Sequence, residues 1–97
     1  MYDVITIGTA SLDVFLKVKN FKASQRFLTF PLGEKIEVTD FNISSGGGAT
    51  NCAVTFKRLG FKPLTVFEVG QDTFKDLIIN KLQKNKIELS VHINKKL

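Results

Sequence analysis

Residues 44–60 read SSGGGATNCAVTFKRLG, and this stretch decides the fold. Three consecutive glycines, Gly46 to Gly48, stand directly before a segment with the pattern of an amphipathic helix, residues 49–59, which ends at Gly60. Glycine has no Cβ atom, so the main chain can approach a neighbouring group closely, and the first N–H groups of a helix are free donors. The stretch therefore predicts a turn and a helix start that can face a ligand.

Strands and a second helix are predicted around this stretch. Apolar and β-branched runs predict buried strands at residues 3–9, 63–69 and 89–93, and apolar residues at helical spacing predict a helix at residues 73–84. Strands that alternate with helices are typical of parallel sheets. We therefore expect an α/β fold, a Rossmann-like parallel sheet with flanking helices.

The segment between the first strand and the glycines does not fit that sheet. Residues 12–19 and 34–43 alternate apolar and polar side chains, as strands with one solvent-exposed face do. Residues 20–31 are mixed, although residues 26–30 could form a short strand. We therefore expect a small β lid, over about residues 14–43, inserted after the first strand.

Composition narrows the class of protein. The chain has 97 residues, 43% of them hydrophobic, and one cysteine, which suits one small globular domain in a reducing compartment, the cytoplasm. The longest uncharged apolar runs are far shorter than the ~20 residues of a membrane span. The net charge of +5 comes mainly from residues 75–97, where lysines alternate with apolar residues at helical spacing. We therefore expect a solvated helix face, with neither nucleic acid nor a membrane as partner.

The glycine cluster has several interpretations. A flexible turn before a helix is the simplest of them. A Walker phosphate loop is excluded because Ala49 follows Gly48 where that motif needs lysine. A dinucleotide fingerprint has some support, because Glu68 lies 20 residues after Gly48, but Asn51 replaces its third glycine.

A polyol site is the physical alternative. The amide of Asn51, one turn into the helix, can both donate to and accept from a hydroxyl group. Asp13 is an acid among apolar residues, and its carboxylate can accept from two neighbouring hydroxyls. The carboxyl ends of parallel strands carry the ligand sites of open sheets, and we expect Asp13 and the glycines to lie there together.

These residues give the chain its resemblance to the ribokinase-like, or PfkB, family of carbohydrate and nucleoside kinases. The likeness covers essentially all 97 residues and follows the order of that family's N-terminal portion. The first family signature is matched at spaced positions: Gly46, Gly47, Ala49, Asn51, Ala53, Gly60 and Gly70. Two positions differ from the common pattern, since Lys75 stands where glycine is common and Gly48 where ribokinases often have lysine.

The resemblance implies phosphoryl transfer from ATP, with Mg²⁺, to a hydroxyl of a small sugar or nucleoside. It implies that Asp13, Gly46, Gly47 and Asn51 bind the substrate, with Ser11 near the same pocket. It also implies that the lid closes over the substrate and, as in several members, pairs with a second subunit to form a homodimer.

The second family signature, an Asp followed closely by Gly-Ala-Gly-Asp, is missing from these 97 residues. The resemblance therefore implies no catalytic base, no metal ligand and no ATP site here, and we expect the isolated chain to be inactive. The alternatives are a non-catalytic sugar- or nucleoside-binding module and, third, a fragment of a dinucleotide-binding oxidoreductase. For Cys52, at the helix start, we expect a packed and inert thiol.

Overall fold

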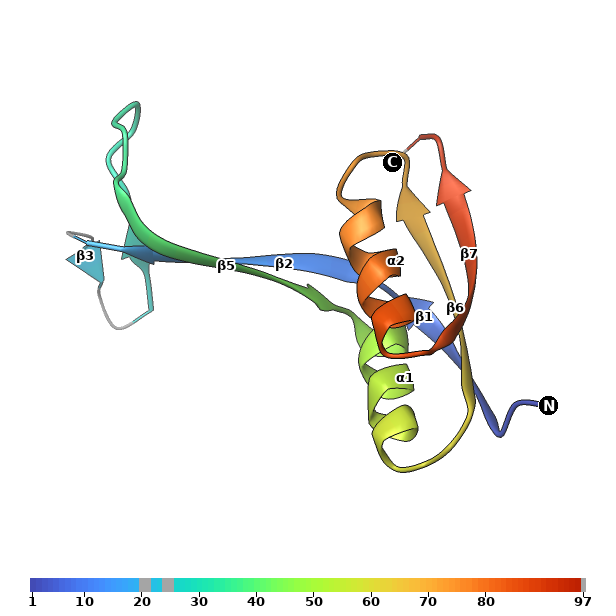
Figure 1. Cartoon of the computed structure of the whole chain (residues 1–97). Coiled ribbons are helices and arrows are strands. Elements are labelled where there is room, and N and C mark those ends of the chain that lie inside the picture. Colours follow the sequence, from blue (N-terminus) through green and yellow to red (C-terminus); the bar gives the residue numbers. More distant parts are fainter. Residues whose placement is uncertain (20–21, 24–25, 97) are drawn as a thin grey trace. The chain divides into compact units, whose positions relative to one another are not determined.

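The structure is a computed structural model that describes residues 1–19, 22–23 and 26–96. The chain divides into two compact units (Figure 1). The core unit consists of Met1–Asp13 and Ser44–Leu97, and the lid unit consists of Val14–Ile43. The lid unit has the same bounds as the segment expected to form a lid; its action as a lid stays a prediction.

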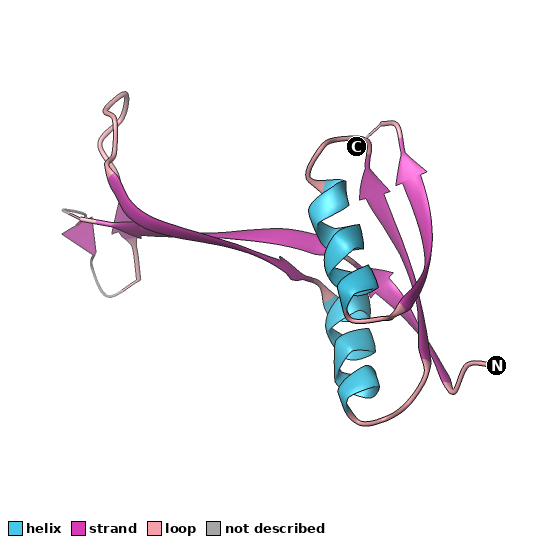
Figure 2. Cartoon of the chain, in the orientation of Figure 1, coloured by secondary structure: helices cyan, strands magenta, loops and turns pink. Residues whose placement is uncertain are grey.

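The core unit contains a parallel sheet of three strands. The strands are β1 (Val4–Thr9), β6 (Pro63–Gly70) and β7 (Glu88–Asn94), in the order β1-β6-β7 (Figure 2). The register places Val4 opposite Pro63, and Leu64 opposite Glu88. The predicted parallel α/β fold is confirmed. No strand of this sheet begins or ends more than one residue from its expected position.

Two helices, α1 (Gly48–Arg58) and α2 (Lys75–Lys84), pack on one face of this sheet (Figure 1). Helix α2 begins two residues later than expected, and the Asp72 side chain accepts a hydrogen bond from its first backbone N–H, that of Lys75, at 3.0 Å. The buried apolar side chains form one cluster between the helices and the sheet: Ala49, Ala53, Phe67, Val69, Ile78, Leu82 and Ile87. Within the described residues no helix is both long enough and apolar enough to cross a bilayer.

The opposite face of the sheet is open among the described residues. Successive strand residues point to opposite faces, and the Thr6 side chain contacts α1, so Ile5 and Ile7 point away from the helices. Their side chains are 56% and 77% exposed. Leu64 and Val66, their partners on β6, are half-buried on the same face. This face is therefore apolar and partly uncovered.

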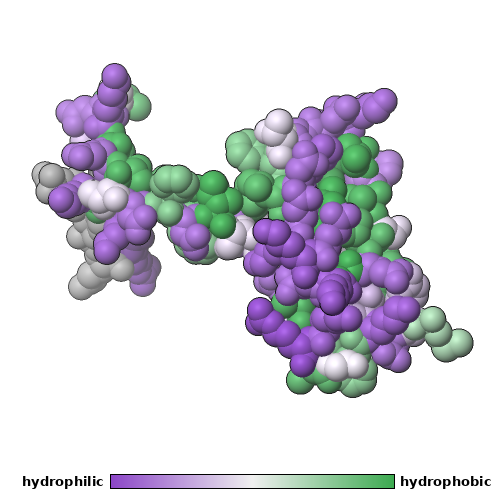
Figure 3. Space-filling model, viewed as in Figure 1, coloured by the Kyte–Doolittle hydropathy of each residue, from purple (hydrophilic) through white to green (hydrophobic). Residues whose placement is uncertain are grey.

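The lid unit consists of extended segments, and its two long strands begin or end in residues of the core unit. Strand β2 (Ser11–Val18) pairs with β5 (Val38–Gly46), and β3 (Lys22–Ala23) pairs antiparallel with β4 (Leu28–Thr29). The Thr39 hydroxyl donates to the carbonyl oxygen of Lys17 at 3.1 Å. Apolar side chains gather along β2 and β5 (Figure 3), and those of Val14, Phe15, Leu16 and Phe41 are exposed.

Strand β5 differs most from its prediction. It begins at Val38 rather than at residue 34, and it continues to Gly46. The apolar alternation stops at Ile43, but the backbone stays extended through Ser44 and Ser45. The short strand β4 falls within residues 26–30 as expected, whereas the two residues of β3 are too few to show a periodic pattern.

Candidate functional site

The candidate site is centred on Asp13, just after the carboxyl end of β1. Asp13 is half-buried, and the Ser11 hydroxyl donates a hydrogen bond to its Oδ1 at 3.1 Å. Gly46 lies against the same carboxyl group: a Cβ atom on Gly46 would overlap Oδ2 of Asp13 and would lie 3.0 Å from Ser11 Oγ. The structure therefore brings Ser11, Asp13 and Gly46 into direct contact, in agreement with the expected proximity of Asp13 and the glycines.

Gly47 forms the N-cap of α1 in a conformation that favours glycine. Its φ is 98° and its ψ is 151°, and a Cβ atom there would overlap the carbonyl oxygen of Thr9. The next N–H, that of Gly48, donates to the Thr9 hydroxyl at 3.1 Å. The glycines therefore let the turn pass tightly over the end of β1, and a flexible linker is not needed to explain them.

Two buried threonines form hydrogen bonds at the start of α1. The Thr6 hydroxyl donates to the carbonyl oxygen of Ala49 at 2.9 Å. The Thr50 hydroxyl lies 2.5 Å from the Gly46 carbonyl oxygen and 3.2 Å from that of Gly47. The sequence interpretation missed both residues, although a threonine in a first helical turn often bonds to the carbonyl three or four residues before it.

Asn51 joins this group through its backbone. Its N–H donates to the Gly47 carbonyl oxygen at 2.9 Å, and its side chain is exposed. The polar part of that side chain is therefore open to solvent from the first turn of α1. Its expected contact with substrate stays a prediction.

A small hollow of about 190 Å³ lies beside Ser11, between the ends of β1 and β6 and the start of α2. Its polar lining includes Ser11, Glu68, Asp72 and Lys75. The Glu68 carboxylate also accepts a hydrogen bond from the Asn94 side chain. Polar groups therefore gather at the carboxyl ends of the strands, where open parallel sheets bind ligands.

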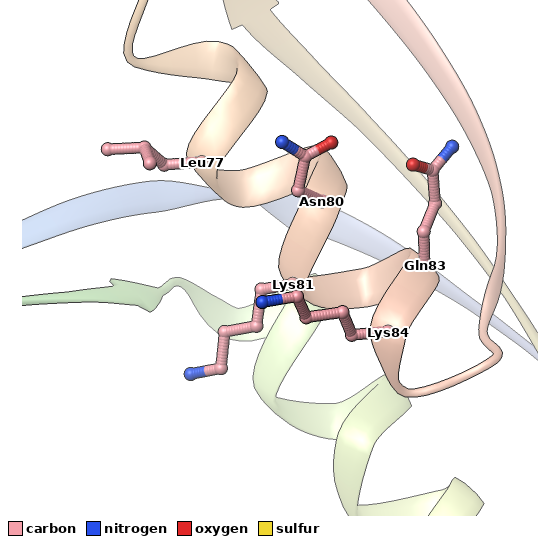
Figure 4. Close-up of a pocket in the computed structure, with 5 residues that line it drawn as sticks. All are labelled: Leu77, Asn80, Lys81, Gln83 and Lys84. Carbon is pink, nitrogen blue, oxygen red and sulfur yellow. The ribbon is translucent and has the colours of Figure 1, made fainter.

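A larger hollow, of about 600 Å³, lies on the outward side of α2. Its lining residues all project from that one helix (Figure 4): Leu77, Asn80, Lys81, Gln83 and Lys84. None of them belongs to the predicted site. This hollow is therefore the solvated lysine-rich helix face that the charge pattern predicts.

The amino ends of the strands carry a separate polar contact. The Tyr2 hydroxyl donates to the Glu88 carboxylate, and this hydrogen bond, with smaller effects of desolvation and of the Glu88 charge, raises the pKa of Tyr2 above its ordinary value of 10.0. Lys62 lies over the Tyr2 ring, 5.5 Å from its centre. Because Asp13 lies at the other end of β1, this titration takes no part in the candidate site.

The residues of the candidate site do not form a metal centre. Across residues 1–19, 22–23 and 26–96, no three His, Cys, Asp or Glu side chains come close enough to hold a metal ion. Mg²⁺ at phosphate-transfer sites is usually held by only one or two carboxylates together with substrate phosphates, so the Mg²⁺ use implied by the resemblance stays a prediction. The expectation of a packed thiol at Cys52 is wrong: Cys52 is exposed and lines a groove between α1 and β1.

Comparison with known proteins identifies the family. The pfkB family of carbohydrate kinases matches residues 1–96. The ATP-dependent 6-phosphofructokinase of Thermoanaerobacterium thermosaccharolyticum is 27% identical over 88 residues, which are 91% of this chain and 23% of that protein. The chain belongs to the PfkB family, whose members are phosphotransferases.

Solved structures show the same fold. A ribokinase from Giardia lamblia matches 97% of this chain with a TM-score of 0.75 and 24% identity, and 28% of its own length is covered. A carbohydrate kinase from Agrobacterium tumefaciens matches 97% of this chain with a TM-score of 0.75 and 19% identity, again over 28% of its length. The chain therefore spans about a quarter of the length of these relatives.

Proposed function

We propose that this chain is the substrate-binding part of an ATP-dependent kinase that phosphorylates a hydroxyl of a sugar or a nucleoside. The observation that carries the proposal is the position of the Asp13 carboxyl group. It accepts a hydrogen bond from Ser11 and lies against Gly46, two residues before α1. The family assignment supports the reaction class, because PfkB carbohydrate kinases transfer phosphoryl groups.

The chemistry of this group suits a polyol. An ionised carboxylate accepts hydrogen bonds at both oxygens, and one oxygen can serve two donors. Ser11 uses one of the positions on Oδ1, which leaves capacity for substrate hydroxyls. Asn51 would add a donor and an acceptor from the helix, and Gly46 and Gly47 would serve the site by letting the turn lie against Asp13 and Thr9. A substrate analogue without the matching hydroxyl would leave a polar group unpaired at a cost of ~1–3 kcal/mol.

We expect the chain by itself to bind substrate without transferring phosphate. Phosphoryl transfer depends on positioning and on neutralising the charge of the transferring group. The sequence contains no Asp followed closely by Gly-Ala-Gly-Asp, the signature to which the resemblance assigns the catalytic base. In this proposal ATP, Mg²⁺ and the catalytic base belong to the part of the kinase that lies outside these 97 residues.

The lid unit would cover the substrate and pair with a second copy of the chain. Its strands expose large apolar side chains, among them Phe15, Leu16 and Phe41, and exposed apolar strands favour association. Lid closure would exclude water and so favour transfer to the substrate over hydrolysis of ATP. A cytoplasmic location is part of this proposal, because the phosphoryl donor would be ATP.

A non-catalytic binding module is the second candidate. The contacts among Ser11, Asp13 and Gly46 need no catalytic base, and the chain covers only 23% of the length of its phosphofructokinase relative. Both candidates bind a polyol at the same place. The kinase candidate predicts that a protein containing this chain together with an ATP-binding part phosphorylates the polyol. The binding-module candidate predicts binding without phosphorylation.

The test measures the affinity of the chain for ribose, fructose 6-phosphate and adenosine, each titrated separately with NMR or calorimetry as the readout. Asp13→Asn keeps the size of the side chain and removes its charge, so we expect it to weaken binding at least about tenfold. Asp3→Asn is the matched control, since Asp3 is exposed just before β1, at the end of that strand opposite to Asp13, and should leave the affinity unchanged. Equal binding by wild type and Asp13→Asn would refute the site, and sugar phosphorylation by the 97-residue chain would refute its inactivity.

A further inference from the structure

We propose that Thr50 is a positioning residue of the substrate site, whose buried hydroxyl holds the glycine turn against the Asp13 carboxylate. This inference rests on the proposed function for its effect on binding. Thr50 is 1% exposed, and its hydroxyl lies within hydrogen-bond distance of two carbonyl oxygens, those of Gly46 and Gly47.

The hydrogen bond of Thr50 joins two different elements. A threonine inside a helix can bond to the carbonyl four residues earlier, which normally belongs to the same helix. Here that carbonyl is Gly46 O, and Gly46 is the last residue of β5 rather than a residue of α1. The hydroxyl therefore ties the end of β5 to the first turn of α1, across the turn at Gly47.

Gly46 in turn defines where the Asp13 carboxylate can lie. Oδ2 of Asp13 occupies the space that a Cβ atom on Gly46 would take, and Ser11 holds Oδ1 from another direction. A displacement of Gly46 would therefore change the space available to the carboxylate without removing its charge. Hydrogen bonds to substrate hydroxyls require that position to be held closely, so a displaced carboxylate would bind more weakly.

Two further contacts keep the other side of the turn in place. The Gly48 N–H donates to the Thr9 hydroxyl, and Ala49 O accepts from Thr6. Both threonines belong to β1, so they fix the start of α1 relative to the sheet. The Thr50 side chain bonds to Gly46, the residue that lies against Asp13, so loss of its hydroxyl should affect the carboxylate.

The experiment replaces the hydroxyl and keeps the shape. Thr50→Val is nearly isosteric, and Thr55→Val is the matched control, because Thr55 lies on the same helix with an exposed side chain. Thr50→Ser restores a hydroxyl. The two readouts are the affinity for ribose and fructose 6-phosphate, and the pH titration of the ¹³C carboxyl signal of Asp13 by NMR.

We expect Thr50→Val to weaken binding about fivefold to tenfold, the usual worth of one buried hydrogen bond, and to shift the Asp13 carboxyl signal. Thr55→Val and Thr50→Ser should stay within about twofold of wild type. A Thr50→Val protein that equals Thr55→Val in both readouts would overturn the proposal.

A purely structural role and a failed proposed function give different results. If wild type binds neither sugar, the proposed function fails, whereas the Asp13 signal still decides whether Thr50 positions the carboxylate. Thr50→Ala, which also lacks the hydroxyl but has a higher helix propensity, is measured beside Thr50→Val. Loss of the folded spectrum in both variants would overturn the positioning role in favour of a purely structural one.

Discussion

Thr65, in the middle of β6, shows how much one hydroxyl can matter in this small core. It is 0% exposed, and its hydroxyl has no hydrogen-bond partner among the described residues. Its neighbour across the sheet, Thr6, is also buried, but the Thr6 hydroxyl donates to Ala49 O. A buried polar group without a partner destabilises the fold, whereas a paired one stabilises it by a modest amount.

We therefore expect the same substitution to act in opposite directions at these two positions. Thr65→Val should raise the free energy of unfolding by about 1 kcal/mol, because it replaces an unpaired hydroxyl by a methyl group of similar size. Thr6→Val should lower it by about 1 kcal/mol. Urea unfolding monitored by circular dichroism measures both. A loss of stability in Thr65→Val would show that its hydroxyl has a partner after all.

At the scale of the elements, the turn from β5 into α1 depends on Gly47. Gly47 and Gly60 both have positive φ, 98° and 92°, but only Gly47 has backbone atoms of Thr9 and Ala10 in the place of a Cβ atom. Gly47→Ala should therefore cost ~3 kcal/mol or more, since it adds a steric overlap to the backbone strain. Gly60→Ala should cost only ~1–2 kcal/mol. Equal losses for the two variants in chemical unfolding would contradict this account.

The elements were predictable where hydrophobic periodicity is strong. The runs that became β1, β6, β7, α1 and α2 have clear patterns, and the structure places them as expected. Residues 44–46 have no such pattern, so the sequence did not predict that β5 continues to Gly46. Their extended conformation comes from pairing and from contacts with residues distant in the chain, which local periodicity cannot reveal.

The candidate site was partly predictable, because the predicted strands already determine which residues lie at the edge of the sheet. Parallel strands end at one edge of the sheet, which was enough to expect Asp13 beside the glycines. The sequence interpretation assigned Gly46 to close approach of a ligand, whereas in the structure the Asp13 carboxylate fills that space. The sequence pattern places Thr6 in a strand and Thr50 in a helix, but it does not predict their hydrogen bonds. The partner of a hydroxyl group depends on tertiary packing.

At the scale of the molecule, exposed apolar side chains gather on two surfaces of the described part of the chain. One is the open face of the sheet with Ile5 and Ile7, and the other consists of the exposed side chains of the lid unit. Surfaces of this kind on a small protein favour association with another chain. The lid unit carries more large exposed side chains, including Phe15, Leu16 and Phe41, so we expect it to form the stronger interface.

Analytical ultracentrifugation over a range of concentrations tests this expectation. The sedimentation coefficient of wild type should rise with concentration. Burial of one phenylalanine contributes about 1.5–3 kcal/mol, so Phe41→Lys should weaken association by about tenfold or more. Ile7→Lys, which places the same charge on the open face of the sheet, should have a smaller effect. The reverse order would move the interface to the sheet, and a single monomeric species at every concentration would contradict association through either surface.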